Sequence, residues 1–261
     1  MSGHVRIVVE GSLGWLVLDH PERRNAVTLE MWQAIPAAAA ALDADPAVRV
    51  VALRGAGEEA FVSGADISEF ERTRTGARAA QAYEDVAIAA FAAVARVTKP
   101  VVAMLHGWCI GGGMALALSA DLRYAADDAV LAIPAARLGL GYHVAGLDAL
   151  VRLVGPSTAK EVLFTARRFA APEALARGLL TEVVAKPALE ARVRTVAAAI
   201  AENAPLTLRS AKRVIGELAR DPTERDGEAM RSSILACFES DDYREGVRAF
   251  LEKRKPTFTG R

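Results

Sequence analysis

Short apolar runs alternate with longer segments of helical periodicity along most of the chain. The alternating segments 6–10 and 15–19 flank a glycine-containing turn and predict a β-hairpin. Further predicted strands, most of them near-continuous apolar runs, cover 48–53, 101–105, 122–125, 130–133 and 182–184. Predicted helices cover 29–45, 76–96, 114–120, 157–165, 172–178 and most of 188–218. Strands that alternate with helices in this way predict an α/β fold.

Local signals indicate where some of these helices begin and end. Thr28 is the expected N-cap of the first helix, and Asp45 with Pro46 marks its end. Pro36 is expected to interrupt or kink that helix, because proline lacks the amide hydrogen that helical bonding needs. Asp66 and Glu69 have the spacing of a capping box for a short following helix.

The pattern changes near residue 200. Residues 1–200 alternate between strands and helices and predict an α/β core that carries the functional site. Residues 201–261 are charged and helical by pattern, which predicts a separate C-terminal helical region.

Composition and charge narrow the function classes. The 261 residues are 52% hydrophobic, with 32 basic and 32 acidic side chains, so no electrostatic footprint for nucleic acid is present. Cys109 and Cys237 lie far apart and form no metal-ligand pattern, so we expect reduced thiols in a cytoplasmic protein. The charged segment 1–10 argues against a signal peptide, and glycines within the uncharged segment 100–120 argue against a membrane span.

The glycine run Gly111–Gly113 stands between a predicted strand and a predicted helix. Free amide N–H groups at the start of a helix are suited to hold a negatively charged oxygen. The run is either such a site or a tight packing turn, while a phosphate loop is disfavoured because no Gly-Lys-Ser/Thr follows it. A second segment upstream, Ser63-Gly64-Ala65-Asp66, favours the site.

These two segments, together with Pro21…Asn25-Ala26, Ile133-Pro134 and Phe250…Pro256, resemble the crotonase (enoyl-CoA hydratase/isomerase) superfamily over nearly the whole chain. The resemblance implies a ββα-spiral core and a C-terminal helical region that builds homotrimers, often stacked into hexamers. It implies an acyl-CoA substrate, with coenzyme A as part of the substrate and no separate cofactor or metal. The amides of Ala65 and Gly112 would be the two donors that hold a thioester enolate, and each such donor is worth about 2.7–4 kcal/mol of activation energy.

The resemblance also implies contacts to the substrate and its coenzyme A. Asp66 would organise the first loop, and basic side chains would meet the phosphates. The candidate binding residues are Arg24, Ala26, Ala65, Asp66, Ile67, Gly111, Gly112, Pro134 and Lys253.

Two residues that hydratases of this family need are absent. Hydration requires titratable groups within hydrogen-bond reach of water and of the adjacent carbon. By resemblance, the glutamates that supply them fall at positions 115 and 135, and this chain has Ala115 and Ala135. Decarboxylation of a malonyl-type thioester tolerates that loss, because departure of CO₂ creates the enolate without a base.

The loop Tyr142-His143 resembles that of methylmalonyl-CoA decarboxylases, another branch of the superfamily, which carry a tyrosine at the position of Tyr142. Two departures are a histidine and a glutamate in those enzymes where this chain has Ala65 and Ala115. Tyr142 or His143 would orient the carboxylate or protonate the enolate, and either could instead serve packing alone.

Three functions therefore stay open. The first is an acyl-CoA lyase or isomerase that relies on the oxyanion site and Tyr142, with decarboxylation as its sharpest form. The second is an enoyl-CoA hydratase with a non-standard acid or base, such as His143 or a carboxylate from the segment Tyr83-Glu84-Asp85. The third is an acyl-CoA-binding protein without catalysis.

Overall fold

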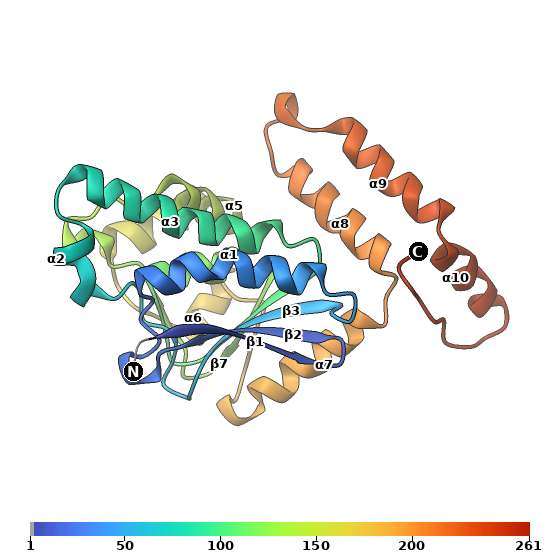
Figure 1. Cartoon of the computed structure of the whole chain (residues 1–261), viewed down its shortest axis with the longest axis horizontal. Coiled ribbons are helices and arrows are strands. Elements are labelled where there is room, and N and C mark those ends of the chain that lie inside the picture. The colour runs from blue at the N-terminus through green and yellow to red at the C-terminus, as the bar shows by residue number, and fades with distance from the viewer. Residues whose placement is uncertain (1–2) are drawn as a thin grey trace.

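The computed structural model describes residues 3–261 and contains two β-sheets with helices packed around them (Figure 1). The larger sheet has, in spatial order, the strands β1 (His4–Glu10), β2 (Leu13–Asp19), β3 (Val50–Gly55), β5 (Val101–Leu105), β7 (Leu122–Ala126) and β10 (Glu182–Val184). The smaller sheet has β4 (Ala60–Val62), β6 (Trp108–Ile110), β8 (Val130–Ala132) and β9 (Phe169–Ala170).

Consecutive strands are divided between the two sheets. The pairs β3–β4, β5–β6 and β7–β8 each place their first strand in the larger sheet and their second in the smaller one, and a helix follows each pair. The chain therefore advances as repeated ββα turns. Among the strand pairs of residues 3–261, only the predicted hairpin β1–β2 and the β8–β9 pair are antiparallel. This arrangement confirms the predicted α/β class and its spiral core.

Helices cover both faces of the larger sheet. The helices are α1 (Leu29–Ala44), α2 (Phe70–Thr73), α3 (Ala77–Arg96), α4 (Gly112–Leu118), α5 (Val144–Thr165), α6 (Ala171–Ala176), α7 (Leu189–Ala201), α8 (Pro205–Leu218), α9 (Gly227–Glu239) and α10 (Asp241–Leu251). Strand β2 shows how the faces divide, since Leu16 and Leu18 join the cluster of α1 and α3 while Trp15 and Val17 join that of α7. The side-chain period of two along a strand produces this division.

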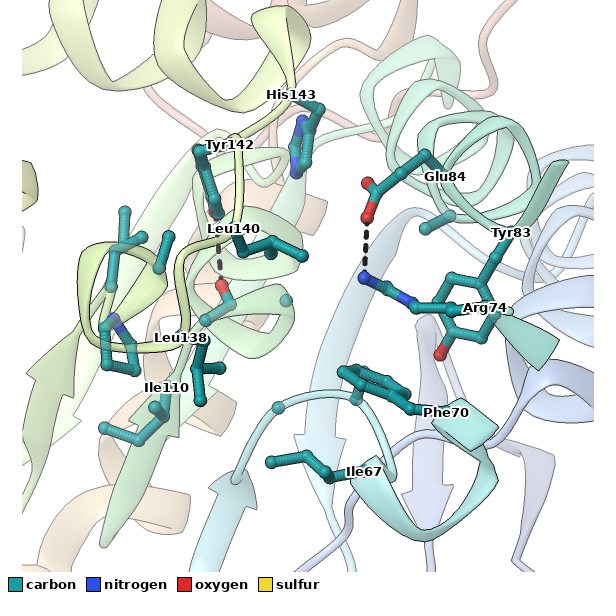
Figure 2. A pocket seen from close by; sticks show the side chains of 18 of the residues that line it. Ile67, Phe70, Arg74, Tyr83, Glu84, Ile110, Leu138, Leu140, Tyr142 and His143 are labelled. Atoms are coloured by element: carbon teal, nitrogen blue, oxygen red, sulfur yellow. Dashed lines mark hydrogen bonds and ion pairs between the residues drawn. The ribbon is translucent and has the colours of Figure 1, made fainter. Parts of the chain in front are cut away.

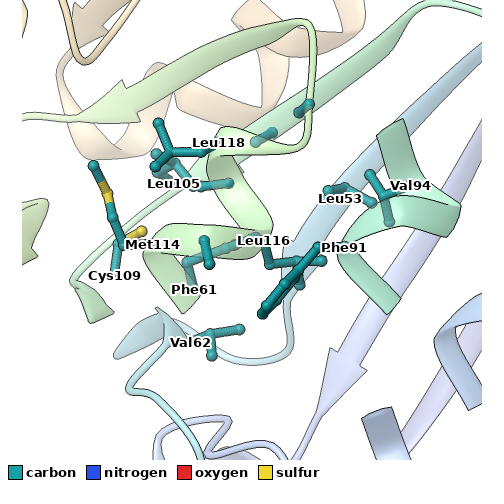
Figure 3. Packing of buried hydrophobic residues seen from close by; sticks show 14 of the residues in the cluster. Leu53, Phe61, Val62, Phe91, Val94, Leu105, Cys109, Met114, Leu116 and Leu118 are labelled. Carbon is teal, nitrogen blue, oxygen red and sulfur yellow. The ribbon is translucent and has the colours of Figure 1, made fainter. Parts of the chain in front are cut away.

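The centre of the fold is the short helix α4, whose residues 113–118 are all buried. It packs beneath β4 and against α3, where Phe61, Leu116 and Phe91 belong to one cluster (Figure 3). A helix that is apolar on every side requires such a surrounding core. The first residue of α4 is part of the glycine run, so this packing fixes the position of the candidate site.

Several boundaries differ from the sequence predictions. Helix α1 starts at the predicted N-cap, Thr28, and continues through Pro36 without interruption, because its buried face, including Ile35, stays packed in the core. The predicted helix 157–165 begins thirteen residues earlier, at Val144, and contains a non-helical residue at Gly155. The predicted stretch 188–218 is two helices, since the chain leaves α7 and restarts at Pro205.

One further prediction was wrong, and two short strands were missed. The capping box of Asp66 and Glu69 does not form: Asp66 accepts the N–H of Ser68 at 3.0 Å as an N-cap, but Glu69 accepts the N–H of Leu29 at 2.8 Å instead. Glu69 thus joins the first loop to the start of α1. The three-residue strands β4 and β6 were also missed, because runs this short carry too little periodicity to be recognised.

Helices α8, α9 and α10 extend away from the two-sheet core (Figure 1). They occupy residues 205–251, within the segment predicted as the C-terminal helical region. Large apolar side chains on them are exposed, among them Phe238, Phe250 and Leu251. Within residues 3–261, the search for a helix both long and apolar enough to cross a membrane finds none.

Candidate active site

The glycine run forms a tight turn between β6 and α4. Gly111 has φ of 55°, in the region that favours glycine, and its N–H donates to the carbonyl of Ala132 at 2.8 Å. A Cβ at Gly113 would lie 2.5 Å from the carbonyl oxygen of Val62, so only glycine lets α4 approach β4 this closely. The turn therefore presents the N–H of Gly112 at the start of α4.

The second segment follows β4 and is held beside Val27. The N–H of Val27 donates to the carbonyl of Gly64 at 2.8 Å, and the N–H of Asp66 donates to the carbonyl of Val27 at 3.0 Å. Successive amides of an extended segment point in opposite directions. The N–H of Ala65 consequently points away from Val27.

The amides of Ala65 and Gly112 face a common space. A Cβ built on Gly112 would lie 3.9 Å from the nitrogen of Ala65. Neither N–H has a hydrogen-bond partner among residues 3–261. Two unpaired donors on neighbouring segments can stabilise one developing oxyanion, and their positions are set by backbone packing rather than by mobile side chains.

Both amides border a cavity of about 120 Å³ (Figure 2). Its described lining is mostly apolar, with aromatic and aliphatic side chains from α1, α3, β6 and the loop before α5. The lining residues predicted from the sequence are Ala65, Ile67, Gly111, Gly112, Pro134, Tyr142 and His143. A narrow apolar cavity with a few polar groups is suited to a short acyl chain.

Tyr142 and His143 lie together on one wall of this cavity (Figure 2). The hydroxyl of Tyr142 donates to the carbonyl of Gly111 at 3.2 Å, and burial raises the pKa of this phenol, so it stays protonated. Tyr142 thereby braces the glycine turn directly beside the oxyanion donor of Gly112.

His143 begins α5 and stacks between two rings. Its Nδ1 accepts the N–H of Gly146 at 2.9 Å, and its ring lies 4.5 Å from that of Tyr142 and 5.0 Å from that of Phe91. Burial lowers the pKa of His143, so the imidazole is neutral at neutral pH and Nε2 carries its proton. The hydrogen bond to Nδ1 therefore caps the start of α5.

The opposite wall carries an ion pair that the sequence analysis did not single out (Figure 2). Nη1 of Arg74 lies 3.0 Å from Oε1 of Glu84, and the two side chains are 11% and 21% exposed. Arg74 was missed because nothing in its spacing indicates a pocket. The recognisable signal was Glu84, which shares the apolar face of α3 with Ala87 and Phe91, at spacings of three and seven residues.

The two alanines at the expected glutamate positions differ in their surroundings. Both are buried in the main hydrophobic cluster, but only Ala135 is among the described residues that line the cavity. Glu84 is the one carboxylate among the described lining residues. Within residues 3–261, no cluster of three or more histidine, cysteine or acidic side chains is placed to hold a metal ion.

Four predicted binding residues lie outside the cavity lining. Arg24 and Ala26 are on the loop before Val27, where Arg24 pairs with Glu59 at 3.3 Å. Asp66 is turned into its own loop, with its carboxylate accepting the hydroxyl of Ser68 at 2.6 Å. Lys253 follows α10, which lies away from the two-sheet core (Figure 1).

The loop that carries Arg24 and Ala26 depends on a buried amide. The side chain of Asn25 donates to the carbonyls of Ala56 and Ala60 at 2.8 and 2.7 Å and accepts the N–H of His20 at 2.9 Å. These bonds tie the loop to the end of β3 and the start of β4. The first donor segment is thus positioned by the same strand, β4, that packs on α4.

Comparisons with known proteins agree with this geometry. Residues 9–261 match the family model described as enoyl-CoA hydratase/isomerase. A crotonyl-CoA hydratase from Syntrophomonas wolfei is 33% identical over 249 residues, covering 95% of each chain. A dienoyl-CoA isomerase from Arabidopsis thaliana is 32% identical, covering 97% of this chain and 95% of its own.

Solved structures match the fold equally well. A crystal structure of an enoyl-CoA hydratase/carnithine racemase from Magnetospirillum magneticum superposes with a TM-score of 0.94 at 36% identity, covering 98% of this chain and 96% of that one. A crystal structure of an enoyl-CoA hydratase/isomerase family protein from Hyphomonas neptunium superposes with a TM-score of 0.94 at 38% identity, covering 98% of each chain. This chain belongs to the enoyl-CoA hydratase/isomerase family, within the crotonase superfamily.

Proposed function

We propose that this enzyme decarboxylates a malonyl-type acyl-CoA by holding the resulting thioester enolate on the amides of Ala65 and Gly112. The proposal is supported by two unpaired amides, those of Ala65 and Gly112, at a cavity whose usual glutamate positions, 115 and 135, are both alanine. An apolar wall at Ala135 also spares the substrate carboxylate the repulsion that a second carboxylate would cause.

The reaction balances without a cofactor. The bond between the carboxylate carbon and the α-carbon breaks, CO₂ leaves, and the electron pair forms an enolate whose charge lies on the thioester oxygen. The two amides stabilise that charge. A proton from water or from Tyr142 then adds to the α-carbon and yields the shorter acyl-CoA.

A direct comparison of two substrates tests this proposal. We expect methylmalonyl-CoA to release CO₂ faster than crotonyl-CoA is hydrated, measured with the same enzyme preparation by coupled CO₂ detection and by loss of enoyl absorbance. Robust hydration without CO₂ release would contradict the proposal. Acyl-CoA binding by calorimetry without turnover of either substrate would instead identify a binding protein.

Removal of the Tyr142 hydroxyl should slow decarboxylation at least tenfold. The change Tyr142→Phe removes a donor to the carbonyl of Gly111, next to the amide that holds the enolate, and removes one source of the final proton. An unchanged kcat, measured by CO₂ release, would exclude Tyr142 from the reaction.

A second candidate is hydration or isomerisation of an enoyl-CoA with Glu84 or His143 as the proton carrier. Both side chains line the cavity, and relatives of this chain include a crotonyl-CoA hydratase and a dienoyl-CoA isomerase. The substrate comparison distinguishes this candidate from decarboxylation, since its product forms without CO₂.

We also infer that the chain assembles through its C-terminal region into homotrimers or stacked trimers, with coenzyme A entering only as part of the substrate. Support comes from the exposed apolar side chains of α9 and α10, with Phe250 83% and Leu251 75% exposed. Light scattering coupled to size exclusion measures the assembly.

We further infer a cytoplasmic location, which the two cysteines without a disulfide support.

A further inference from the structure

Arg74 occupies a corner of the cavity formed by two aromatic rings. Its Cζ lies 4.2 Å from the ring centre of Phe70 and 4.0 Å from that of Tyr83, and the two rings are inclined at 71°. Tyr83 is itself fixed, because its hydroxyl accepts the indole N–H of Trp32 at 3.0 Å. The rings hold the guanidinium in place through cation–π contacts.

The hydrogen bonding of this guanidinium is incomplete. Guanidinium has five N–H donors. The ion pair with Glu84 engages Nη1, and the buried Nε has no hydrogen-bond partner among the described residues. A buried donor without an acceptor costs free energy and calls for an explanation, which a missing ligand can supply.

The charge of Arg74 also stands out against its surroundings. Among the described residues that line the cavity, Arg74 is the one permanent cation and Glu84 the one carboxylate, while the remaining wall is apolar or neutral. Figure 2 shows the pair on the wall opposite Tyr142 and His143, facing the space between them. An acyl group in this cavity therefore meets a fixed positive charge.

We propose that Arg74 is a specificity-determining residue that binds a carboxylate carried by the acyl group, with Glu84 as its counter-ion when the cavity is empty. A planar guanidinium accepts a carboxylate edge-on through two donors, and side chains that pack against its faces leave those edges open. Glu84 orients Arg74, and it competes with the substrate for the same guanidinium. This inference rests on the proposed function and specifies its substrate class.

Binding to unreactive ligands tests the inference without turnover. Succinyl-CoA and pentanoyl-CoA form a pair of similar length that differs in a carboxylate, and calorimetry measures the dissociation constant of each. We expect Arg74→Met to weaken succinyl-CoA binding at least tenfold and to change pentanoyl-CoA binding less than twofold. Arg72→Met is the matched control, because Arg72 lies in α2, which ends just before Arg74, but is 78% exposed, and it should change neither value.

The counter-ion role predicts a change of opposite sign. Glu84→Gln removes the competing carboxylate, so we expect succinyl-CoA to bind at least threefold more tightly while pentanoyl-CoA is unaffected. If Arg74→Met fails to fold, Arg74→Lys takes its place as the test. Lysine keeps the charge but loses the planar donor edge, so this variant should retain part of the preference for succinyl-CoA over pentanoyl-CoA. Parallel weakening of both ligands in Arg74→Met and Arg74→Lys, or unchanged succinyl-CoA binding in Glu84→Gln, would overturn the inference.

Kinetics separate this inference from the proposed reaction. In the proposed reaction, Arg74 binds the substrate carboxylate, and this carboxylate loses its negative charge as CO₂ departs. The contact is therefore stronger in the ground state than in the transition state. Arg74→Met should raise KM for methylmalonyl-CoA at least tenfold and leave kcat unchanged or higher. If the wild-type enzyme prefers succinyl-CoA but releases no CO₂, carboxylate recognition stands and decarboxylation fails. If CO₂ is released but Arg74→Met keeps the preference for succinyl-CoA, decarboxylation stands and carboxylate recognition by Arg74 fails.

Discussion

Gly112→Pro should lower kcat about 10²- to 10³-fold on whichever acyl-CoA the enzyme turns over. Proline has no amide hydrogen, so the change removes one of the two donors that would hold the thioester oxygen, and its Cδ occupies the place of that hydrogen. Proline is well tolerated at the first position of a helix, where Gly112 begins α4. Steady-state kinetics with the substrate identified in the CO₂ and hydration comparison provides the measurement.

Gly112→Ala is the matched control for this variant. Alanine keeps the N–H but adds the same Cβ, which would lie 3.0 Å from the indole of Trp32. We expect a kcat within about tenfold of wild type, because the oxyanion donor survives and only a side-chain contact tightens. Equal losses in the two variants would mean that crowding of Trp32, rather than the missing donor, causes the effect.

The tight turn at Gly111–Gly113 could be predicted from the sequence, whereas the roles of the Ala65 and Gly112 amides came from the family resemblance and stay a prediction. Positions such as Gly111 and Gly113 accept only glycine, one for its positive φ and one for its contact with Val62, so the residue type itself reveals the geometry. The parallel strand β5 was equally clear, because a strand covered on both faces is apolar throughout, as Val101–Leu105 is.

Features that depend on long-range contact could not be predicted in the same way. Glu69 has the spacing of a local capping box, yet its carboxylate bonds the N–H of Leu29, forty residues away in the chain. The ion pair of Arg74 with Glu84 depends on how α2 turns back onto α3, which no periodicity encodes. Helix α5 extends to His143 because that side chain caps it, and Gly155 with Pro156 had obscured the helical pattern.

These two classes of feature divide the chemistry of the site. In the proposed reaction, the backbone donors would hold the thioester oxygen, and their positions are set by the packing of α4 against β4. Side chains of α2, α3 and the loop before α5 decide which acyl group fits and where its protons go. Ala115 and Ala135 are both buried, and Ala135 also lines the cavity, so neither position supplies a titratable group to the site.

Phe61→Ala should reduce the free energy of unfolding by about 3–5 kcal/mol, which is a large part of the stability of a typical domain. Phe61 is fully buried in β4, in the same cluster as α4 and α3 (Figure 3). Truncation leaves a cavity that the surrounding strands and helix cannot fill, since close packing at Gly113 already fixes α4 against β4. Denaturant unfolding followed by circular dichroism measures the change.

Two comparisons isolate the cause of that loss. Phe164→Ala removes the same side chain from the surface of α5, where it is 77% exposed, and should change stability by no more than about 0.5 kcal/mol. Phe61→Leu keeps most of the volume and should cost clearly less than Phe61→Ala.

Because β4 leads directly into the segment that carries Ala65, we expect Phe61→Ala also to lower kcat at temperatures where the protein is still folded. Full activity there would show that the oxyanion donors keep their positions without the support of this core residue.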